Sequence, residues 1–135
     1  MTARVIDKVA WLHLEDARIL STRSRGKDIY YLPGGKRESG ESDEQCLSRE
    51  IREELAVSLT PGSLRPRGVF TAQAHGNPPG TIIQLSCYAA DYEGTLAPSA
   101  EIEEFAWLTY ADRDRVAPVD QIIFDWLRER GELRE

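Results

Sequence analysis

The stretch LPGGKRESGESDEQCLSREIREELAV, residues 32–57, joins a glycine bend to a strongly charged segment. Ser42 followed by Gln45 fits a capping box, in which each side chain binds the backbone N–H of the other residue. Apolar side chains then recur every four positions from Leu47 to Leu55, which is the pattern of a helix with one buried face. The stretch therefore predicts a helix from Ser42 to Leu55.

Three glutamates of this helix share one side of it. A helix advances about 100° per residue, so Glu50, Glu53 and Glu54 fall within an arc of about 100° beside the apolar stripe. Like charges at this spacing repel one another, and Arg49, four positions before Glu53, offsets only part of the repulsion. One interpretation is an ordinary solvated face. The other is a set of carboxylates around Mg²⁺ or Mn²⁺, which are hard cations that take oxygen ligands.

The residues before the helix favour the second interpretation. Gly34 and Gly35 allow the backbone to approach a ligand closely, so a carbonyl there can supply another oxygen. Glu41 lies just before the N-cap. A tight turn at Pro-Gly-Gly is also expected, and it is compatible with a ligand site.

The remaining elements are read from shorter patterns. A helix is predicted to begin near Pro118 and to end before Gly131, with apolar residues at helical spacing between them. Strands are predicted at residues 5–14, 19–24, 29–32, 67–74, 81–92 and 103–110. Strands and helices are mixed without regular alternation, which predicts a mixed sheet covered by helices.

Composition limits the class of protein. The chain has 135 residues and 41% hydrophobic residues, which is typical of one globular domain, here residues 1–135. Its net charge of −6 excludes a general attraction for nucleic acid or anionic membranes. Cys46 and Cys87 are expected as free thiols, and no apolar run suggests a signal peptide or membrane span. We expect a cytoplasmic protein.

The central stretch resembles the box of the Nudix hydrolase family, MutT-like members included. The match runs from Gly35 through five residues to Glu41, through seven residues to Arg49-Glu50-Ile51, and through one more to Glu53-Glu54. Ala56-Val57 closes it. The resemblance implies an α/β fold, a Nudix-type α/β/α sandwich with a mixed β-sheet between helices. One position departs, since the family has glycine where this chain has Ala56. A left-handed C-cap there would cost alanine about 1 kcal/mol.

The resemblance also implies the roles of particular residues. Metal ligands would be Glu50, Glu53 and Glu54, with the Gly35 carbonyl assisting, and the metal would be Mg²⁺ or Mn²⁺. Arg49 would pair with Glu41 and position the loop. The catalytic group would comprise Glu53, Glu50, Arg49 and Glu104. Glu53 is the first candidate for the general base, and Glu104 is chosen from the later acidic group Glu101, Glu103 and Glu104. That later group is alternatively a solvated loop end.

Substrate contacts are expected from residues around the start of the box. Tyr31 or Tyr30 and Arg23 or Arg25 are suited to stacking on a base or binding a phosphate, with simple packing or exposure as the alternative. Lys36 is a further candidate. We select Arg23, Tyr31 and Lys36.

The predicted reaction is metal-dependent hydrolysis of a pyrophosphate bond in a nucleoside diphosphate linked to X. A (d)NTP or an oxidised dNTP is the preferred substrate. Hydrolysis of ADP-ribose, a nucleotide sugar or a dinucleoside polyphosphate is the alternative, although the downstream proline of ADP-ribose members is absent. A non-catalytic nucleotide-binding module of the same fold is a second alternative, and an unrelated acidic scaffold domain is a third. The partner is a small-molecule nucleotide, not nucleic acid or a membrane, and a homodimer is suggested by the resemblance alone.

Overall fold

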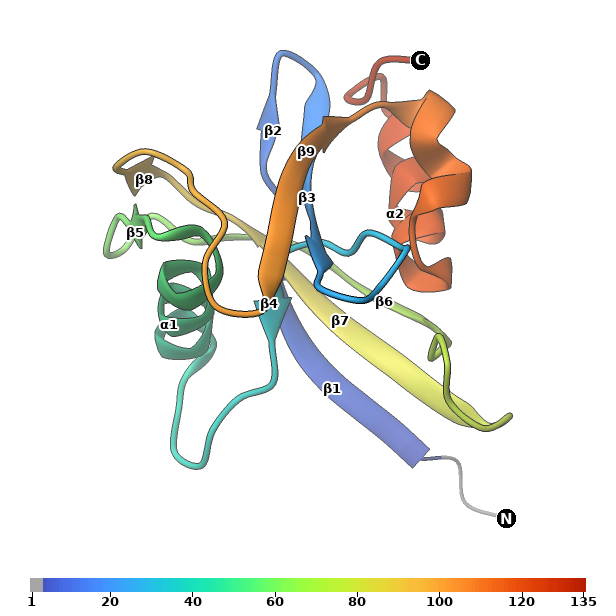
Figure 1. The fold of residues 1–135 in the computed structure, drawn as a ribbon, viewed down its shortest axis with the longest axis horizontal. Coiled ribbons are helices and arrows are strands. Elements are labelled where there is room, and N and C mark those ends of the chain that lie inside the picture. The colour runs from blue at the N-terminus through green and yellow to red at the C-terminus, as the bar shows by residue number, and fades with distance from the viewer. Residues whose placement is uncertain (1–3) are drawn as a thin grey trace.

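The computed structural model describes residues 4–135, so residues 1–3 of the predicted domain lie outside it. Two helices lie on opposite sides of a set of strands (Figure 1). This confirms the predicted α/β fold with strands between helices. The elements are β1 (Arg4–Trp11), β2 (Leu14–Glu15), β3 (Arg18–Ser24), β4 (Gly34–Gly35), α1 (Asp43–Leu55), β5 (Ser58–Leu59), β6 (Arg65–Gln73), β7 (Thr81–Ala89), β8 (Tyr92–Glu93), β9 (Ile102–Leu108), a 3-10 helix (Tyr110–Arg115) and α2 (Pro118–Glu129).

The helix α1 forms where its capping signals predicted. The Gln45 backbone N–H donates to the Ser42 hydroxyl at 3.1 Å, and the Ser42 N–H donates to the Gln45 side chain at 2.9 Å. The helix ends at Ala56, whose φ of 60° and ψ of 26° lie in the left-handed region. The predicted left-handed C-cap is therefore present, and it is made by alanine.

The strands form three small sheets. The largest has the order β4-β1-β7-β6, in which β1 and β7 are parallel and the other neighbours are antiparallel. A second antiparallel sheet has the order β2-β3-β9, and β5 pairs with β8. The parallel pair next to antiparallel pairs confirms a mixed sheet.

Side-chain alternation on the strands builds a core on each side. On β1, Ala10 packs into the cluster that contains α2, while its neighbours Val9 and Trp11 pack into the cluster that contains α1. On β3, Ile19 and Leu20 divide between the two clusters in the same way. Each strand therefore buries both of its faces, because successive side chains point in opposite directions.

Three predicted strands require correction. The strand expected at 5–14 stops at Trp11, and Leu14–Glu15 joins a different sheet. The strand expected at 81–92 is interrupted after Ala89 in the same manner. Residues 29–32 form only isolated bridges, Tyr30 to Val116 and Tyr31 to Thr22. In each case the residues are apolar and β-prone, but their backbone partners change along the segment, which local pattern does not reveal.

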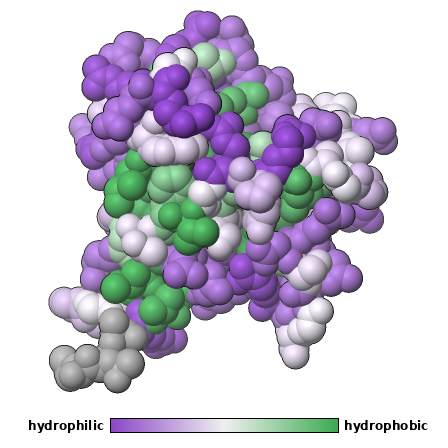
Figure 2. Space-filling view, turned by 180° about the vertical axis from the view of Figure 1, so that it is seen from behind, coloured by the Kyte–Doolittle hydropathy of each residue, from purple (hydrophilic) through white to green (hydrophobic). Residues whose placement is uncertain are grey.

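The surface is mostly hydrophilic, with an apolar area on the face opposite to the view of Figure 1 (Figure 2). Val5, Val69 and Ile122 are the large apolar side chains exposed among the described residues. No helix within residues 4–135 is both long and apolar enough to span a membrane.

Candidate active site

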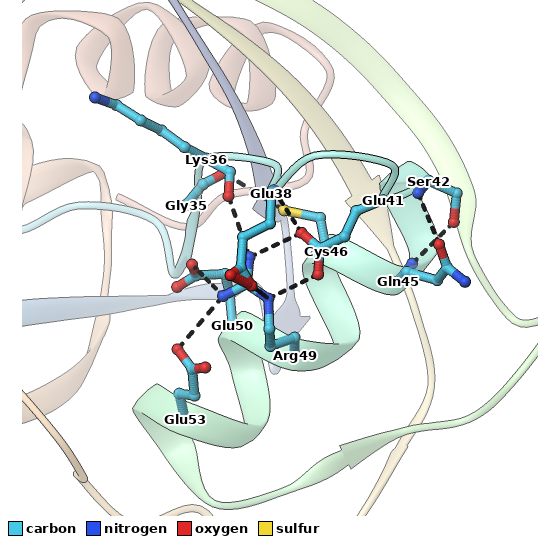
Figure 3. A network of polar contacts seen from close by, with 10 residues as sticks. All are labelled: Gly35, Lys36, Glu38, Glu41, Ser42, Gln45, Cys46, Arg49, Glu50 and Glu53. Carbon is cyan, nitrogen blue, oxygen red and sulfur yellow. Dashed lines mark hydrogen bonds and ion pairs between the residues drawn. The ribbon is translucent and has the colours of Figure 1, made fainter.

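An ion-pair clamp holds the loop before α1 against the helix (Figure 3). Arg49 donates through Nε to Glu41 Oε2 at 2.7 Å and through Nη2 to Glu41 Oε1 at 2.9 Å. It also donates to the Lys36 carbonyl at 3.2 Å. The Arg49 guanidinium holds the pKa of Glu41 at about 2, aided by the Glu38 backbone N–H. The pairing of Glu41 with Arg49 that the resemblance implied is therefore present, and it is bidentate.

The same arginine orients Glu50. Arg49 Nη1 donates to Glu50 Oε1 at 2.9 Å. The Glu50 carboxylate lies directly over Gly35, so that a Cβ at position 35 would be 2.5 Å from Glu50 Cδ and 2.6 Å from Oε1. Only glycine leaves room for the carboxylate at this point. The Gly35 carbonyl accepts a weak hydrogen bond from the Cys46 thiol at 3.7 Å.

Glu54 is the buried member of the acidic group, with 4% of its surface exposed. Burial raises the pKa of Glu54 to about 9, and the neighbouring Glu50 adds to the rise through a hydrogen bond and its charge. The charge of Glu101 acts in the same direction, while the Gly34 backbone opposes it. A buried carboxyl beside a second one is costly to ionise unless a cation is close.

The third glutamate points outward. Glu53 is 53% exposed, and its carboxylate lies 3.5 Å from Arg49 Nη1 (Figure 3). Consequently no group of three acidic, histidine or cysteine side chains within residues 4–135 is gathered closely enough to hold a metal ion.

Glu50 and Glu54 nevertheless have the chemistry of ligands for a divalent cation. Glu50 and Glu54 bring two carboxylates together beside a glycine backbone, and the buried one resists ionisation as long as no positive charge faces it. The outward position of Glu53 means that its side chain must rotate away from Arg49 to join them.

A cavity of about 320 Å³ opens beside this group. Gly34, Gly35 and Glu54 contribute to its wall on the side of the acidic group. Opposite walls come from β1, β6, β7 and the start of α2. Tyr31 lines the cavity, with its ring 6.5 Å from that of His75, and burial raises the pKa of Tyr31.

The other predicted contacts lie elsewhere. Arg23 donates from Nε to Glu104 at 3.3 Å and from Nη1 to the Lys27 carbonyl at 2.9 Å, and neither Arg23 nor Glu104 lines the cavity. Glu104 also accepts a hydrogen bond from the Tyr30 hydroxyl, so that Tyr30 and Arg23 together lower the pKa of Glu104. The Lys36 side chain is exposed and extends away from the glutamates (Figure 3). Of the three selected residues, only Tyr31 reaches the cavity.

Three charged residues that line the cavity, Lys8, Lys27 and Asp120, carried no prediction from the sequence, and Glu101 was considered there but not selected. Asp120, in the first turn of α2, is 1% exposed and lines the cavity together with Lys8 of β1. Glu101 lines it too, in contrast to Glu104 three positions later. A signal for Asp120 does exist in the sequence, because it occupies a position in the apolar stripe of α2.

Comparisons with known protein families, sequences and structures agree with one another on the family of this chain. Residues 5–127 match the NUDIX domain. The chain is 33% identical over 98 residues to a CTP pyrophosphohydrolase of Escherichia coli, covering 69% of this chain and 68% of that protein. It is 31% identical over 107 residues to the NAD-capped RNA hydrolase NudC of Photobacterium profundum, covering 77% of this chain and 37% of that protein. The solution structure of the E. coli ORF135 protein matches with a TM-score of 0.71 and 28% identity, covering 95% of this chain and 94% of that one.

Proposed function

The chain belongs to the NUDIX domain family, a family of pyrophosphohydrolases, and from this premise we propose that it hydrolyses a pyrophosphate bond of a nucleoside triphosphate with Mg²⁺ or Mn²⁺. The observation that carries the proposal is the juxtaposition of Glu50 and Glu54 at the glycine bend, where Glu54 and both glycines line a cavity of about 320 Å³. The proposed substrates of the protein are (d)NTPs or oxidised dNTPs.

Glu50 and Glu54 would hold the metal, with the Gly35 backbone beside them and Glu53 joining after release from Arg49. When bound there, the ion would neutralise charge on the pyrophosphate and lower the pKa of a water molecule. Arg49 acts as a positioning residue, since its guanidinium is used by Glu41, Glu50 and the Lys36 carbonyl. Replacing Arg49 would therefore displace both the Glu50 carboxylate and the loop before α1.

The proton from the attacking water requires a carboxylate that is open to the cavity. Glu101 meets this condition because it lines the cavity and its charge acts on Glu54. Glu53 meets it only after its side chain turns inward. We therefore place Glu101 beside Glu53 as a candidate general base, ahead of Glu104, whose carboxylate is bound by Arg23 and Tyr30.

One relative supports the proposed substrate class. The chain is 33% identical to a protein named as a CTP pyrophosphohydrolase, and the two align over two thirds of each. The structural match to the ORF135 protein covers 95% of this chain and 94% of that one.

The test is a turnover assay with Mg²⁺ across the four NTPs, oxidised dNTPs, ADP-ribose, a nucleotide sugar and a dinucleoside polyphosphate. We expect release of pyrophosphate from one or more triphosphates, and its loss in Glu54→Gln. This variant keeps the shape of the side chain but removes the negative charge. Turnover of ADP-ribose alone would contradict the triphosphate assignment, and full activity of Glu54→Gln would contradict the metal site.

The second candidate is a nucleotide-binding module without catalysis. The outward position of Glu53 and its contact with Arg49 favour this candidate, because the carboxylates are not gathered in advance. The same assay separates the two. Tight nucleotide binding without turnover of any substrate would establish the module.

A further inference from the structure

The loop between β8 and β9, which carries Glu101, is tied to the end of α1 through its backbone. The Ala97 N–H donates to the Leu55 carbonyl at 3.0 Å, and the Ser99 N–H donates to the Glu54 carbonyl at 2.9 Å. Carbonyls in the last turn of a helix have no partner inside the helix, so the loop supplies one to each of these two. The loop is therefore fixed to the part of α1 that carries Glu54.

A turn with a strained backbone closes this loop just before β9. The Ile102 N–H donates to the Ser99 carbonyl at 3.0 Å, which encloses Ala100 and Glu101 as the two central residues. Ala100 has a φ of 52°, in the left-handed region. This region disfavours alanine relative to glycine by about 5- to 30-fold in population. Contacts from outside the turn are therefore needed to keep Ala100 in this conformation.

Arg25, in the loop after β3, supplies such contacts. Its guanidinium Nη1 donates to the Ala100 carbonyl, and its backbone N–H donates to the Glu101 carbonyl at 2.9 Å. One residue thus binds two successive carbonyls of the turn. The Arg25 side chain is exposed and does not line the cavity, so it does not face the space in which a substrate would bind.

The conformation of the turn decides where the Glu101 side chain points. Glu101 lines the cavity, and its charge acts on Glu54, which lines the same cavity. If Ala100 relaxed to a negative φ, the peptide between Ala100 and Glu101 would rotate and redirect the Glu101 side chain. The left-handed backbone at Ala100 is thus part of what presents this carboxylate to the cavity.

We propose that Arg25 is a positioning residue, which holds the turn at Ala100 so that the Glu101 carboxylate stays in the cavity that Glu54 also lines. This inference rests on the proposed function, because Arg25 acts only through a candidate base of that reaction. Without the guanidinium, Ala100 leaves the left-handed region in most molecules. The rate then falls in proportion to the fraction of molecules that keep the competent turn.

The first variant is Arg25→Met, which removes the guanidinium but keeps the apolar stem and the backbone N–H. At saturating Mg²⁺ and triphosphate, we expect kcat to fall by about 5- to 30-fold while KM stays within about twofold. Arg25→Lys keeps a cationic donor and should recover part of the loss. Arg65→Met is the matched control, because Arg65 is also exposed and donates to a backbone carbonyl, that of Ser63 at 3.0 Å, but does not line the cavity. Its kcat should equal that of the parent.

The decisive variant combines Arg25→Met with Ala100→Gly. Glycine adopts a positive φ without steric cost, so the turn no longer depends on the guanidinium. In the Ala100→Gly background, Arg25→Met should therefore lower kcat by less than about threefold. A loss that glycine does not rescue, or a raised KM with kcat unchanged, would mean that Arg25 contacts the substrate and would overturn the positioning role.

Hydrogen exchange makes the test independent of turnover. The Ile102 amide is bonded within the turn, so its exchange rate, measured by NMR without metal, reports how often the turn opens. We expect this exchange to be about 5- to 30-fold faster in Arg25→Met and to slow again when Ala100→Gly is added. Thermal melts check that each variant is folded.

The two measurements separate the possible failures. Unchanged exchange at Ile102 in Arg25→Met overturns the clamp on the turn. Faster exchange with an unchanged kcat overturns the role of that clamp in catalysis. Faster exchange in a protein whose parent form hydrolyses no triphosphate supports the clamp and overturns the proposed activity instead.

Discussion

Replacing Gly35 with alanine should separate folding from catalysis in this protein. The backbone at Gly35 lies outside the left-handed region, so alanine is tolerated by the chain itself. The new Cβ would lie 2.5–2.8 Å from the three carboxylate atoms of Glu50. Ordinary contacts between carbon atoms are about 3.5–4.0 Å, so the carboxylate must move by about 1 Å.

The effect of Gly35→Ala on stability should be much smaller than its effect on the rate of catalysis. The displaced atoms are the end of a flexible side chain, and an altered side-chain rotamer costs about 0.5–1.5 kcal/mol. A misplacement of about 1 Å in a catalytic constellation can reduce the rate by about 10²-fold. Gly35→Ala should therefore melt within a few degrees of the parent protein while its kcat/KM with Mg²⁺ falls by about 10²-fold.

The assay is a Mg²⁺ titration of turnover together with a thermal melt, and the chain offers two comparisons. Gly34→Ala would drive its Cβ into the Val9 backbone carbonyl at a φ of 152°, so that variant should lose stability as well. Adding Glu50→Gln to Gly35→Ala should cause little further loss, because both changes act on one carboxylate. Activity of Gly35→Ala within about threefold of the parent would refute the reasoning that Glu50 must occupy this position.

The other predictions concern single side chains outside this contact. Ala56→Gly should be neutral or stabilise the fold by up to about 1 kcal/mol, because glycine adopts the left-handed cap without strain, and a lowered melting temperature would contradict this. Burial raises the pKa of Asp120 to about 7, so the native state retains a proton that the unfolded chain releases, and stability should fall by up to about 4 kcal/mol as pH rises from about 4 to about 7. Asp120→Asn should remove that fall, as measured by urea midpoints at pH 5 and pH 8; an unchanged pH dependence would exclude Asp120 as its source. Glu101→Gln should lower kcat by about 10²-fold whereas Glu104→Gln should mainly lower the melting temperature, and the reverse pattern would return the catalytic role to Glu104.

The sequence by itself determined the features whose causes lie within one turn or one helix. The capping box at Ser42 and the apolar stripe of α1 depend on neighbours a few positions away, and both are present; the left-handed cap at Ala56 is present too, but it was expected only from the family resemblance. The pairing of Glu41 with Arg49 also connects residues of one short segment, so the family pattern was sufficient to predict it.

Tertiary structure decided which of the charged residues reach the cavity. Arg23 and Glu104 looked available in the sequence, but the antiparallel register of β3 and β9 sets them opposite each other, and they neutralise one another. The sequence analysis assigned no role to Asp120, and the packing of α2 on the sheet buries it in the wall of the cavity that Lys8 also lines. Strand register and helix packing join residues far apart in the chain, and local periodicity carries no record of those contacts.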